Sequence, residues 1–288
     1  MIDPIFLAEA AINGILLGGV LALLALGLNL IFGVLDIVWI AYVDLVMLSM
    51  YLVYFLVMVY GWPVWLGGLG GVALGVVLGV AVHLLIITPI LNSPPINQLL
   101  ATGGLLFFIQ SFATFLWTSD HRSVRLTLPI IEVGGMFLSY ARLVAFGLSI
   151  VAVIGLYLFL TRTFVGTAIR AVSQDREAMA LMGANPQRVY IVTSAVGGAM
   201  AGVAAALLSI QYSVHPYFGA AFGPITFMIC VLGGLGNMVG AFVAAFVMSE
   251  IISVGGVLWS TEMGYVIAFV VFIVMMFIRP GGLLAKRE

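Results

Sequence analysis

The main shortage in this 288-residue sequence is charge, since Asp, Glu, Lys and Arg together make up 7% of the residues. Soluble domains carry about 25%. Hydrophobic residues reach 64%, and the mean hydropathy is +1.28. The 34 glycines suit helices that pack closely in a bilayer, because small residues let backbones approach. The composition predicts a polytopic membrane protein with an all-α fold, and we expect a lipid membrane and no nucleic acid around it.

Other shortages exclude several chemistries. Lys286 is the only lysine and is followed by Arg287, so the chain has no G-x-x-x-x-G-K-[ST] phosphate-binding loop. Cys230 is the only cysteine, which excludes an internal disulfide and a cysteine zinc cluster. Neither H-E-x-x-H nor G-x-S-x-G occurs. We therefore expect no enzyme activity, no catalytic site and no bound metal or cofactor in this chain.

Nine stretches are candidate membrane spans, since a helix needs about 20 mostly apolar residues to cross a bilayer. They are residues 9–34, 38–60, 64–88, 97–117, 140–161, 189–212, 221–234, 237–257 and 261–279. The seventh is short and ends at a glycine-rich GGLGN, which fits either a broken helix lining a transport site or one tilted hairpin. We expect eight to ten membrane segments, nine by count, in a single transmembrane domain over 1–288.

The basic residues predict the orientation, because cytoplasmic loops carry an excess of Lys and Arg. Four of the ten lie between 162 and 188, and three lie at 279, 286 and 287. These two regions are therefore predicted to be cytoplasmic, with the N-terminus outside. The two arginines of loop 118–139, which this orientation also places outside, run against the rule.

One hydrophilic stretch, GTAIRAVSQDREAMALMGANPQRV at 166–189, interrupts the apolar sequence. Asp175 is a suitable helix cap, Glu177 favours the positive helix end, and Gly183 suits the left-handed residue after a helix. Three residues at helical spacing form one narrow apolar face: Ala178, Leu181 and Met182. The pattern predicts a two-turn amphipathic helix at the cytoplasmic surface. It either rests on lipid headgroups or docks a soluble partner.

A resemblance favours the docking interpretation. EAMALMG resembles the cytoplasmic loop of ABC-importer permeases, whose short helix sits in a groove of the ATPase. More narrowly, the stretch 161–189 resembles permeases of branched-chain (hydrophobic) amino acid ABC importers. Further similar motifs follow in the same order: ALGLNLIFGVLDIV, PPINQLLATGGLLFFIQ, VLGGLGNMVGAFVAA and RPGGLL. The resemblance implies an ATPase-coupling role for loop 162–188 and for eight of its residues: Arg170, Asp175, Arg176, Glu177, Ala178, Leu181, Met182 and Gly183.

The sequence departs from that family at IVWIAYVD, residues 37–44, where the family tends to read I-N-F-A-H-G-D/E. The departure leaves two solute classes open. One is a branched-chain or hydrophobic amino acid, and the other is a urea-like amide or an aromatic or carboxylate compound. Candidate pathway residues are Asn29, Trp39, Tyr42, Asp44, Thr102 and Asn237. Intramembrane acids are costly and suggest function. For the polar residues, interhelical hydrogen bonding is an equally compatible role.

The resemblance implies a set of partners in a bacterial inner membrane. They are a second permease subunit (a paralogue or the same chain), two cytoplasmic ATPase subunits and a periplasmic solute-binding protein. In this scheme the N-terminus is periplasmic and the C-terminus cytoplasmic, and ATP is bound by the partners. The rival interpretation is a proton-coupled secondary carrier in which Asp44 and Glu250 relay protons. His83, inside a span, either lies on the pathway or forms a hydrogen bond within the bundle.

Overall fold

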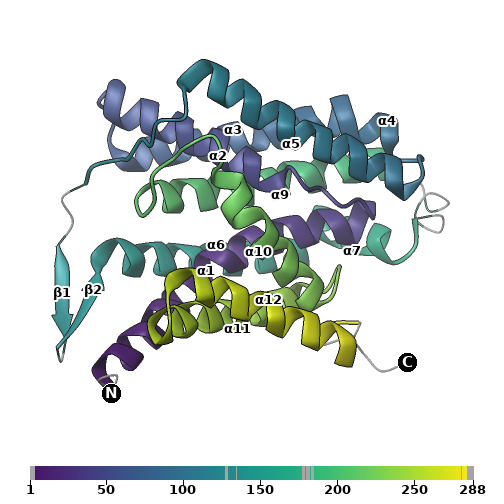
Figure 1. Ribbon diagram of the computed structural model, residues 1–288. Coiled ribbons are helices and arrows are strands. Elements are labelled where there is room, and N and C mark those ends of the chain that lie inside the picture. Colours follow the sequence, from purple (N-terminus) through teal and green to yellow (C-terminus); the bar gives the residue numbers. More distant parts are fainter. Residues whose placement is uncertain are drawn as a thin grey trace.

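The computed structural model describes residues 4–126, 129–133, 135–176, 179, 182, 185–279 and 281–283, and these form a bundle of helices (Figure 1). The elements are α1 (Pro4–Leu35), α2 (Tyr42–Tyr54), η1 (Phe55–Val59), α3 (Val64–Val82), η2 (His83–Ile87), α4 (Thr88–Ile90), α5 (Pro95–Trp117), β1 (Ile130–Val133), β2 (Met136–Ser139), α6 (Tyr140–Arg162), α7 (Phe164–Gln174), α9 (Pro186–Ser209), α10 (Phe218–Gly233), α11 (Met238–Leu258) and α12 (Thr261–Ile278). Glu177, Ala178, Leu181 and Gly183 lie outside the described residues.

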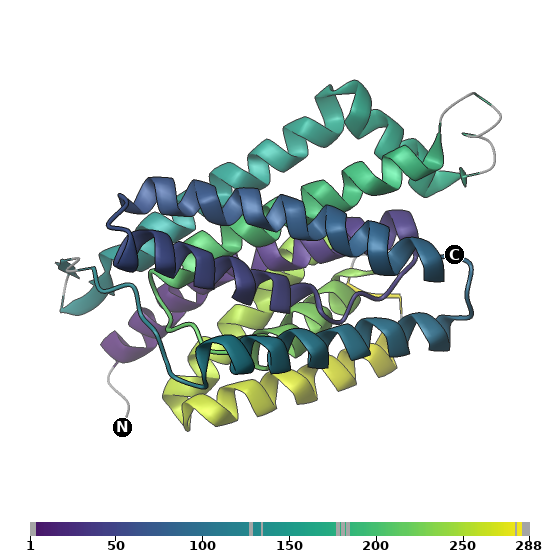
Figure 2. The same cartoon turned by 90° about the horizontal axis from the view of Figure 1, so that it is seen from above.

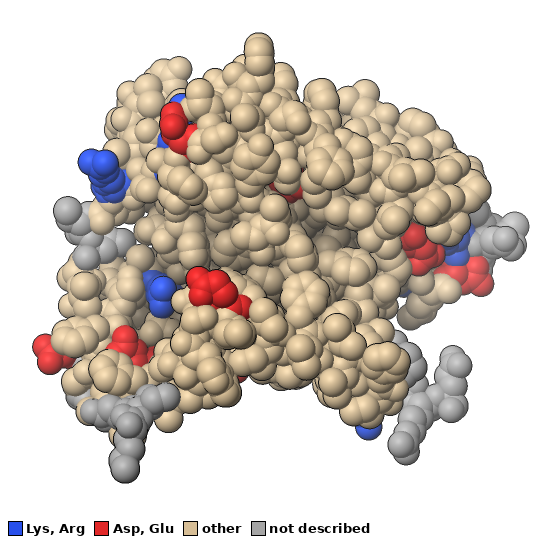
Figure 3. Space-filling model, viewed as in Figure 1, with Lys and Arg blue, Asp and Glu red and all other residues tan. Residues whose placement is uncertain are grey.

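The predicted helical membrane fold is confirmed. Eight helices of the described chain are long and apolar enough to cross a membrane, and α10 is a shorter apolar helix of 16 residues. At 1.5 Å per residue α10 spans about 24 Å, less than the hydrocarbon core. Figure 3 shows charged side chains gathered mainly toward two opposite sides, which leaves a largely uncharged middle.

Helix α1 lies at the centre of the bundle. Its most apolar 18-residue window is 83% buried inside the protein, against 11% for that of α12. It packs chiefly against α11, α9 and α6. Figure 2 shows α5 and α12 along one margin of the molecule, and in Figure 1 α10 crosses between them. Most of the α12 surface is therefore left for lipid or for another protein.

Glycine allows a close helix contact between α3 and α9. A Cβ added at Gly198 would lie 2.2 Å from the Gly75 carbonyl oxygen, and one added at Gly79 would lie 2.5 Å from the Ser194 carbonyl oxygen. Only a residue without a side chain permits this approach, so the small residues of both helices set their spacing.

Two local features differ from a purely helical chain. Strands β1 and β2 form an antiparallel hairpin, and Gly135 next to their turn has a φ of +84°. Glycine favours this backbone conformation, which hairpin turns require. In addition, α2 begins at Tyr42 rather than near residue 38, because residues 36–39 lie outside regular secondary structure.

The loop after α5 and the loop before α10 are tied together. Arg122, after α5, and Val214, before α10, form an isolated antiparallel bridge with hydrogen bonds of 2.9 and 2.8 Å. The adjacent His121 and His215 rings lie with centroids 4.4 Å apart. The two helices that this bridge links, α5 and α10, are also two walls of the cavity described below.

Candidate functional site

The link from α1 to α2 shapes one wall of a cavity. Helix α1 ends at Leu35, and Asp36 has a φ of +56°, a left-handed conformation that Asp adopts more readily than most residues. The chain then passes beside α5, where the Thr102 hydroxyl donates to the Val38 carbonyl oxygen at 3.0 Å. This places Trp39 in the interior, 1% exposed. Its ring meets the Tyr42 ring edge-on, with centroids 6.1 Å apart.

The cavity itself has a volume of about 450 Å³ and lies between α1, α2, α5 and α10. Its lining is mostly apolar and includes Leu28, Trp39, Tyr42, Phe107, Gln110 and Gly219. Figure 3 shows the face seen in Figure 1 hollowed in its middle. An apolar lining with a few polar groups is typical of a small-solute site. The predicted pathway residues Trp39 and Tyr42 both line this cavity.

Tyr42 is fixed within that wall. Its hydroxyl donates to the Gly197 carbonyl oxygen of α9 at 2.9 Å. A Cβ at Gly27 of α1 would lie 2.0 Å from the same hydroxyl oxygen, so Gly27 leaves the space that the hydroxyl fills. The phenol therefore holds α2 against α9, and its ring remains available to the cavity.

Asp44 lies directly behind the cavity wall and is 1% exposed. Its Oδ1 accepts a hydrogen bond from Gln110 Nε2 at 3.1 Å. A Cβ added at Gly219 would stand 2.4 Å from the same oxygen, so the α10 backbone passes against the carboxyl group. Sequence reasoning named Asp44 but missed Gly219; the signal was the glycine spacing in FGAAFGP at the start of α10.

Asn29 and Asn237, also predicted for the pathway, meet elsewhere. Asn29 donates to the Asn237 carbonyl oxygen at 2.9 Å and accepts from the Gly236 N–H at 2.8 Å. Asn237 Oδ1 caps α11 by accepting from the Gly240 N–H at 3.0 Å. These contacts hold the turn between α10 and α11. The two asparagines line a separate cavity of about 590 Å³ together with Arg170.

Other polar groups inside the spans have local partners or neighbours. His83 Nδ1 lies 2.9 Å from Ser194 Oγ, which matches the hydrogen bond expected within the bundle. Glu250 lies against Gly14, where an added Cβ would meet its carboxylate at 2.8 Å. Glu250 and Asp44 sit on different elements, and Glu250 borders another cavity than the one beside Asp44. The structure places no relay between them in the described chain.

The hydrophilic stretch begins with a helix that sequence reasoning did not separate. In α7 the Thr163 hydroxyl caps the helix by accepting from the Gly166 N–H at 2.9 Å, and Arg170 is exposed. After α7, the Met179 N–H donates to the Asp175 carbonyl oxygen at 3.3 Å. This is the hydrogen bond that one turn of an α-helix forms. Met182 is 85% exposed. An apolar side chain this exposed has no covering surface in the described chain.

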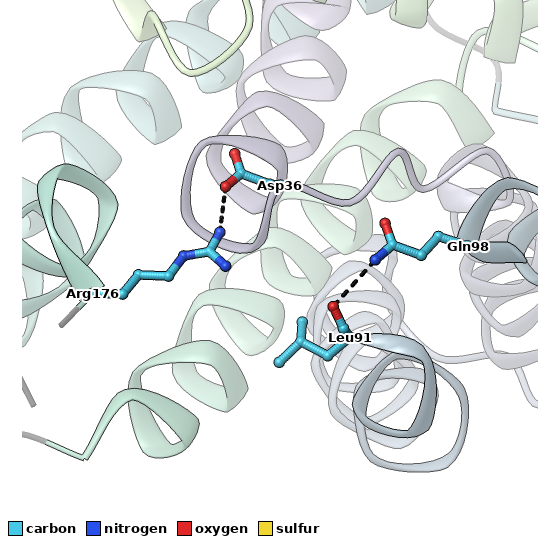
Figure 4. A network of polar contacts seen from close by, with 4 residues as sticks. All are labelled: Asp36, Leu91, Gln98 and Arg176. Atoms are coloured by element: carbon cyan, nitrogen blue, oxygen red, sulfur yellow. Dashed lines mark hydrogen bonds and ion pairs between the residues drawn. The ribbon is translucent and has the colours of Figure 1, made fainter. Parts of the chain in front are cut away.

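Arg176 connects this stretch to the end of α1. Its guanidinium donates to Asp36 at the end of α1, as Figure 4 shows, and lies 5.7 Å from the centroid of the Tyr190 ring. In the same view Gln98 donates to the Leu91 carbonyl oxygen at 3.2 Å, which closes the turn before α5. The Asp36 link places the stretch next to residues 36–41, and these lead into the cavity wall.

Comparison with known proteins places this arrangement in a family. The family described as "Branched-chain amino acid transport system / permease component" matches residues 10–276. The chain belongs to this family. It is therefore a multi-pass membrane permease of the ABC-importer type, as the resemblance implied.

Its relatives cover almost the whole chain. The permease protein LivH of the high-affinity branched-chain amino acid transport system of Escherichia coli K12 is 25% identical over 303 residues, covering 99% of this chain and 97% of LivH. BraD of Pseudomonas aeruginosa is 25% identical over 299 residues, covering 97% of this chain and 96% of BraD. A solved structure, PsaBC from Streptococcus pneumoniae in complex with Fab, has a TM-score of 0.52 at 13% identity and covers 93% of this chain and 91% of that one. That likeness shows the fold alone.

Proposed function

We propose that this chain is the translocating subunit of a binding-protein-dependent importer for a branched-chain or similar hydrophobic amino acid. The observation that carries the proposal is the 450 Å³ cavity, whose apolar walls suit an aliphatic side chain. Its few polar groups suit the charged end of an amino acid. The membership of the family and the full-length relatives named for branched-chain amino acid transport support the same solute class.

The energy comes from partner subunits in this proposal. Two ATPase subunits bind the cytoplasmic face at loop 162–188, a second permease completes the pathway, and a periplasmic binding protein delivers the solute. The N-terminus is periplasmic, the C-terminus cytoplasmic, and the membrane is a bacterial inner membrane. The exposed Met182 supports a docked partner at the loop, because an uncovered apolar side chain gains free energy when it is buried.

The contact between Arg176 and Asp36 supports a route for coupling. ATP-driven closure of the ATPase pair moves the loop as a rigid body, and the ion pair passes this motion to the turn between α1 and α2. That turn carries Trp39, which lines the cavity. Movement at the loop therefore alters the cavity wall.

The test is ATP hydrolysis by the reconstituted complex, with and without loaded binding protein. We expect loaded binding protein to stimulate hydrolysis, and Met182→Asp to lower the stimulated rate by about tenfold because it puts a charge into an apolar contact. Asn92→Asp, at an exposed position in the turn between α4 and α5 and outside loop 162–188, is the matched control and keeps the wild-type rate. Wild-type stimulation in the Met182→Asp complex would contradict the docking role.

A further inference from the structure

Unpaired polar atoms concentrate along one segment of the described chain. Five buried side-chain atoms lack a hydrogen-bond partner, and four of them lie between residues 39 and 51. Two belong to the cavity region: Trp39 Nε1 and Asp44 Oδ2. An unsatisfied buried polar atom costs about 1–3 kcal/mol, so such atoms indicate a ligand or a strained site.

Asp44 lacks a cation as well as a second hydrogen bond. The ion pair found in the described residues joins Arg176 to Asp36, directly after α1, and does not include Asp44. The contact that Asp44 does make, with Gln110, is to a neutral amide. A carboxylate inside a membrane protein is stable when a cation or several donors face it. A positively charged group beside Asp44 would therefore stabilise the carboxylate, and the described chain does not supply one.

A cation can approach the Asp44 carboxyl group from the cavity. Gln110 and Gly219 both line the cavity, and both touch Asp44 from that side. Because Gly219 has no side chain, α10 adds only backbone between the carboxyl group and the cavity. Turning the Gln110 side chain away removes the one side-chain hydrogen bond on the Asp44 carboxyl group. The amide can turn its carbonyl oxygen to the incoming cation, since an amide both donates and accepts.

We propose that Asp44 is the counter-charge for the ammonium group of the transported solute, with Trp39 Nε1–H as the donor for the solute carboxylate. The inference rests on the proposed function and adds the chemistry of recognition to it. An ammonium group has three donors and no acceptor, so it can bind both Asp44 oxygens: Oδ1, which faces Gln110 and Gly219, and the unpaired Oδ2. The indole N–H is a donor only, which matches a carboxylate. The aliphatic side chain of the solute lies against Leu28 and Phe107.

The experiment measures equilibrium binding of radiolabelled leucine to the complete complex in nanodiscs, without ATP and without binding protein. Two competitors each keep only one of the two charged groups of leucine. 3-Methylbutylamine keeps the ammonium group and the branched chain, and 4-methylpentanoate keeps the carboxylate and the branched chain. We expect the amine to compete at least about tenfold better than the acid, because the buried counter-charge attracts cations and repels anions.

Two variants test which residue binds the ammonium group of the solute and which binds its carboxylate. Asp44→Asn keeps the shape, removes the charge and weakens leucine binding by about tenfold or more. Trp39→Phe weakens binding of leucine but leaves binding of the amine unchanged, since the amine has no carboxylate. Ser49→Ala is the matched control, because Ser49 is another fully buried polar residue of α2 without a side-chain partner, and it keeps wild-type binding.

Three results would overturn the inference: equal competition by the acid and the amine, wild-type leucine binding in Asp44→Asn, or no leucine binding to the wild-type complex. The competitor comparison uses the wild-type protein, so it stands even if a variant fails to fold. Failure of the proposed function is a separate outcome. In that case the wild-type complex shows no ATP-driven leucine uptake with its binding protein, whatever the binding measurement gives.

Discussion

Arg176 and Asp36 are 140 positions apart in the sequence, yet they form the ion pair that joins loop 162–188 to the end of the first helix. Their side chains are 38% and 70% exposed. At this exposure an ion pair contributes about 0–1 kcal/mol to stability. Its importance in our account lies in its position, between the ATPase-facing loop and the turn that leads into the cavity wall.

Reversing the charge of Arg176 tests that position. Arg176→Glu places two acids together and breaks the link, so we expect binding-protein-stimulated ATP hydrolysis to fall by about tenfold while membrane insertion and yield are unchanged. Arg279→Glu is the matched control, because it reverses an exposed charge directly after α12, outside loop 162–188. Full stimulated activity in the Arg176 variant would remove the ion pair from the coupling route.

Gly219 tests the packing of α10 on the carboxyl group. Gly219→Ala forces a methyl group to within 2.4 Å of Asp44 Oδ1, so we expect a loss of about 1–3 kcal/mol in stability. Gly223→Ala lies one turn further along the same helix and meets no atom within 4 Å. It therefore gains helix propensity, up to about 1 kcal/mol. Thermal unfolding in detergent measures the stability of both variants. Equal unfolding midpoints would contradict the close contact between Gly219 and Asp44.

The approach of α3 to α9 makes a second packing prediction. Gly198→Ala would place a methyl group 2.2 Å from the Gly75 carbonyl oxygen. Because this oxygen belongs to the backbone of α3, one of the two helices has to shift to relieve the clash. We expect about 1–3 kcal/mol of destabilisation and a lower unfolding midpoint. Gly104→Ala, in α5, meets nothing within 4 Å and serves as the control. A Gly198 variant as stable as the Gly104 variant would show that the helices do not meet at this point.

The contact between the His121 and His215 rings predicts a pH effect. Burial, and then the positive charge of neighbouring His121, lower the pKa of His215 from its ordinary value of 6.5. The folded protein therefore favours the neutral form of this histidine more than the unfolded chain does. Between pH 6.5 and the lower folded value the unfolded state binds more protons, so stability falls as the pH drops through that window. Above pH 6.5 this group adds no pH dependence.

The measurement is the unfolding midpoint of wild type and His215→Asn across pH 5 to 8. We expect the wild-type midpoint to decline below about pH 6.5 and the variant to lose that part of the decline, since Asn has no titrating group. His121→Asn, which removes the neighbouring charge, shows a smaller decline than wild type. Identical pH profiles in wild type and His215→Asn would contradict the assignment.

Much of the fold follows from the sequence, because an apolar run of about 20 residues is long enough to be a helix across a bilayer whatever it packs against. The nine stretches correspond to helices of the structure. Their ends were less predictable. The start of α2 depends on the left-handed Asp36 and on the hydrogen bond from Thr102 to Val38, and neither contact has a local sequence pattern.

The candidate site was only partly predictable. Asp44 and Trp39 were identifiable as unusual residues within a span, but their neighbourhood depends on long-range packing. Gln110 meets Asp44 from 66 positions away. Asn29 and Asn237 have the same polar character in the sequence, yet the structure uses them to close the α10–α11 turn. Residue type indicates that a buried polar group needs a partner, while the fold decides which partner it receives.

The most direct test of the account is leucine uptake into proteoliposomes that hold this chain, its partner permease and the two ATPase subunits. Loaded binding protein is supplied on the outer side, and ATP on the side of loop 162–188. The account predicts accumulation of leucine that requires ATP and the binding protein together and persists when the proton gradient is collapsed. Uptake without ATP that follows a proton gradient would contradict it and would make this chain a secondary carrier.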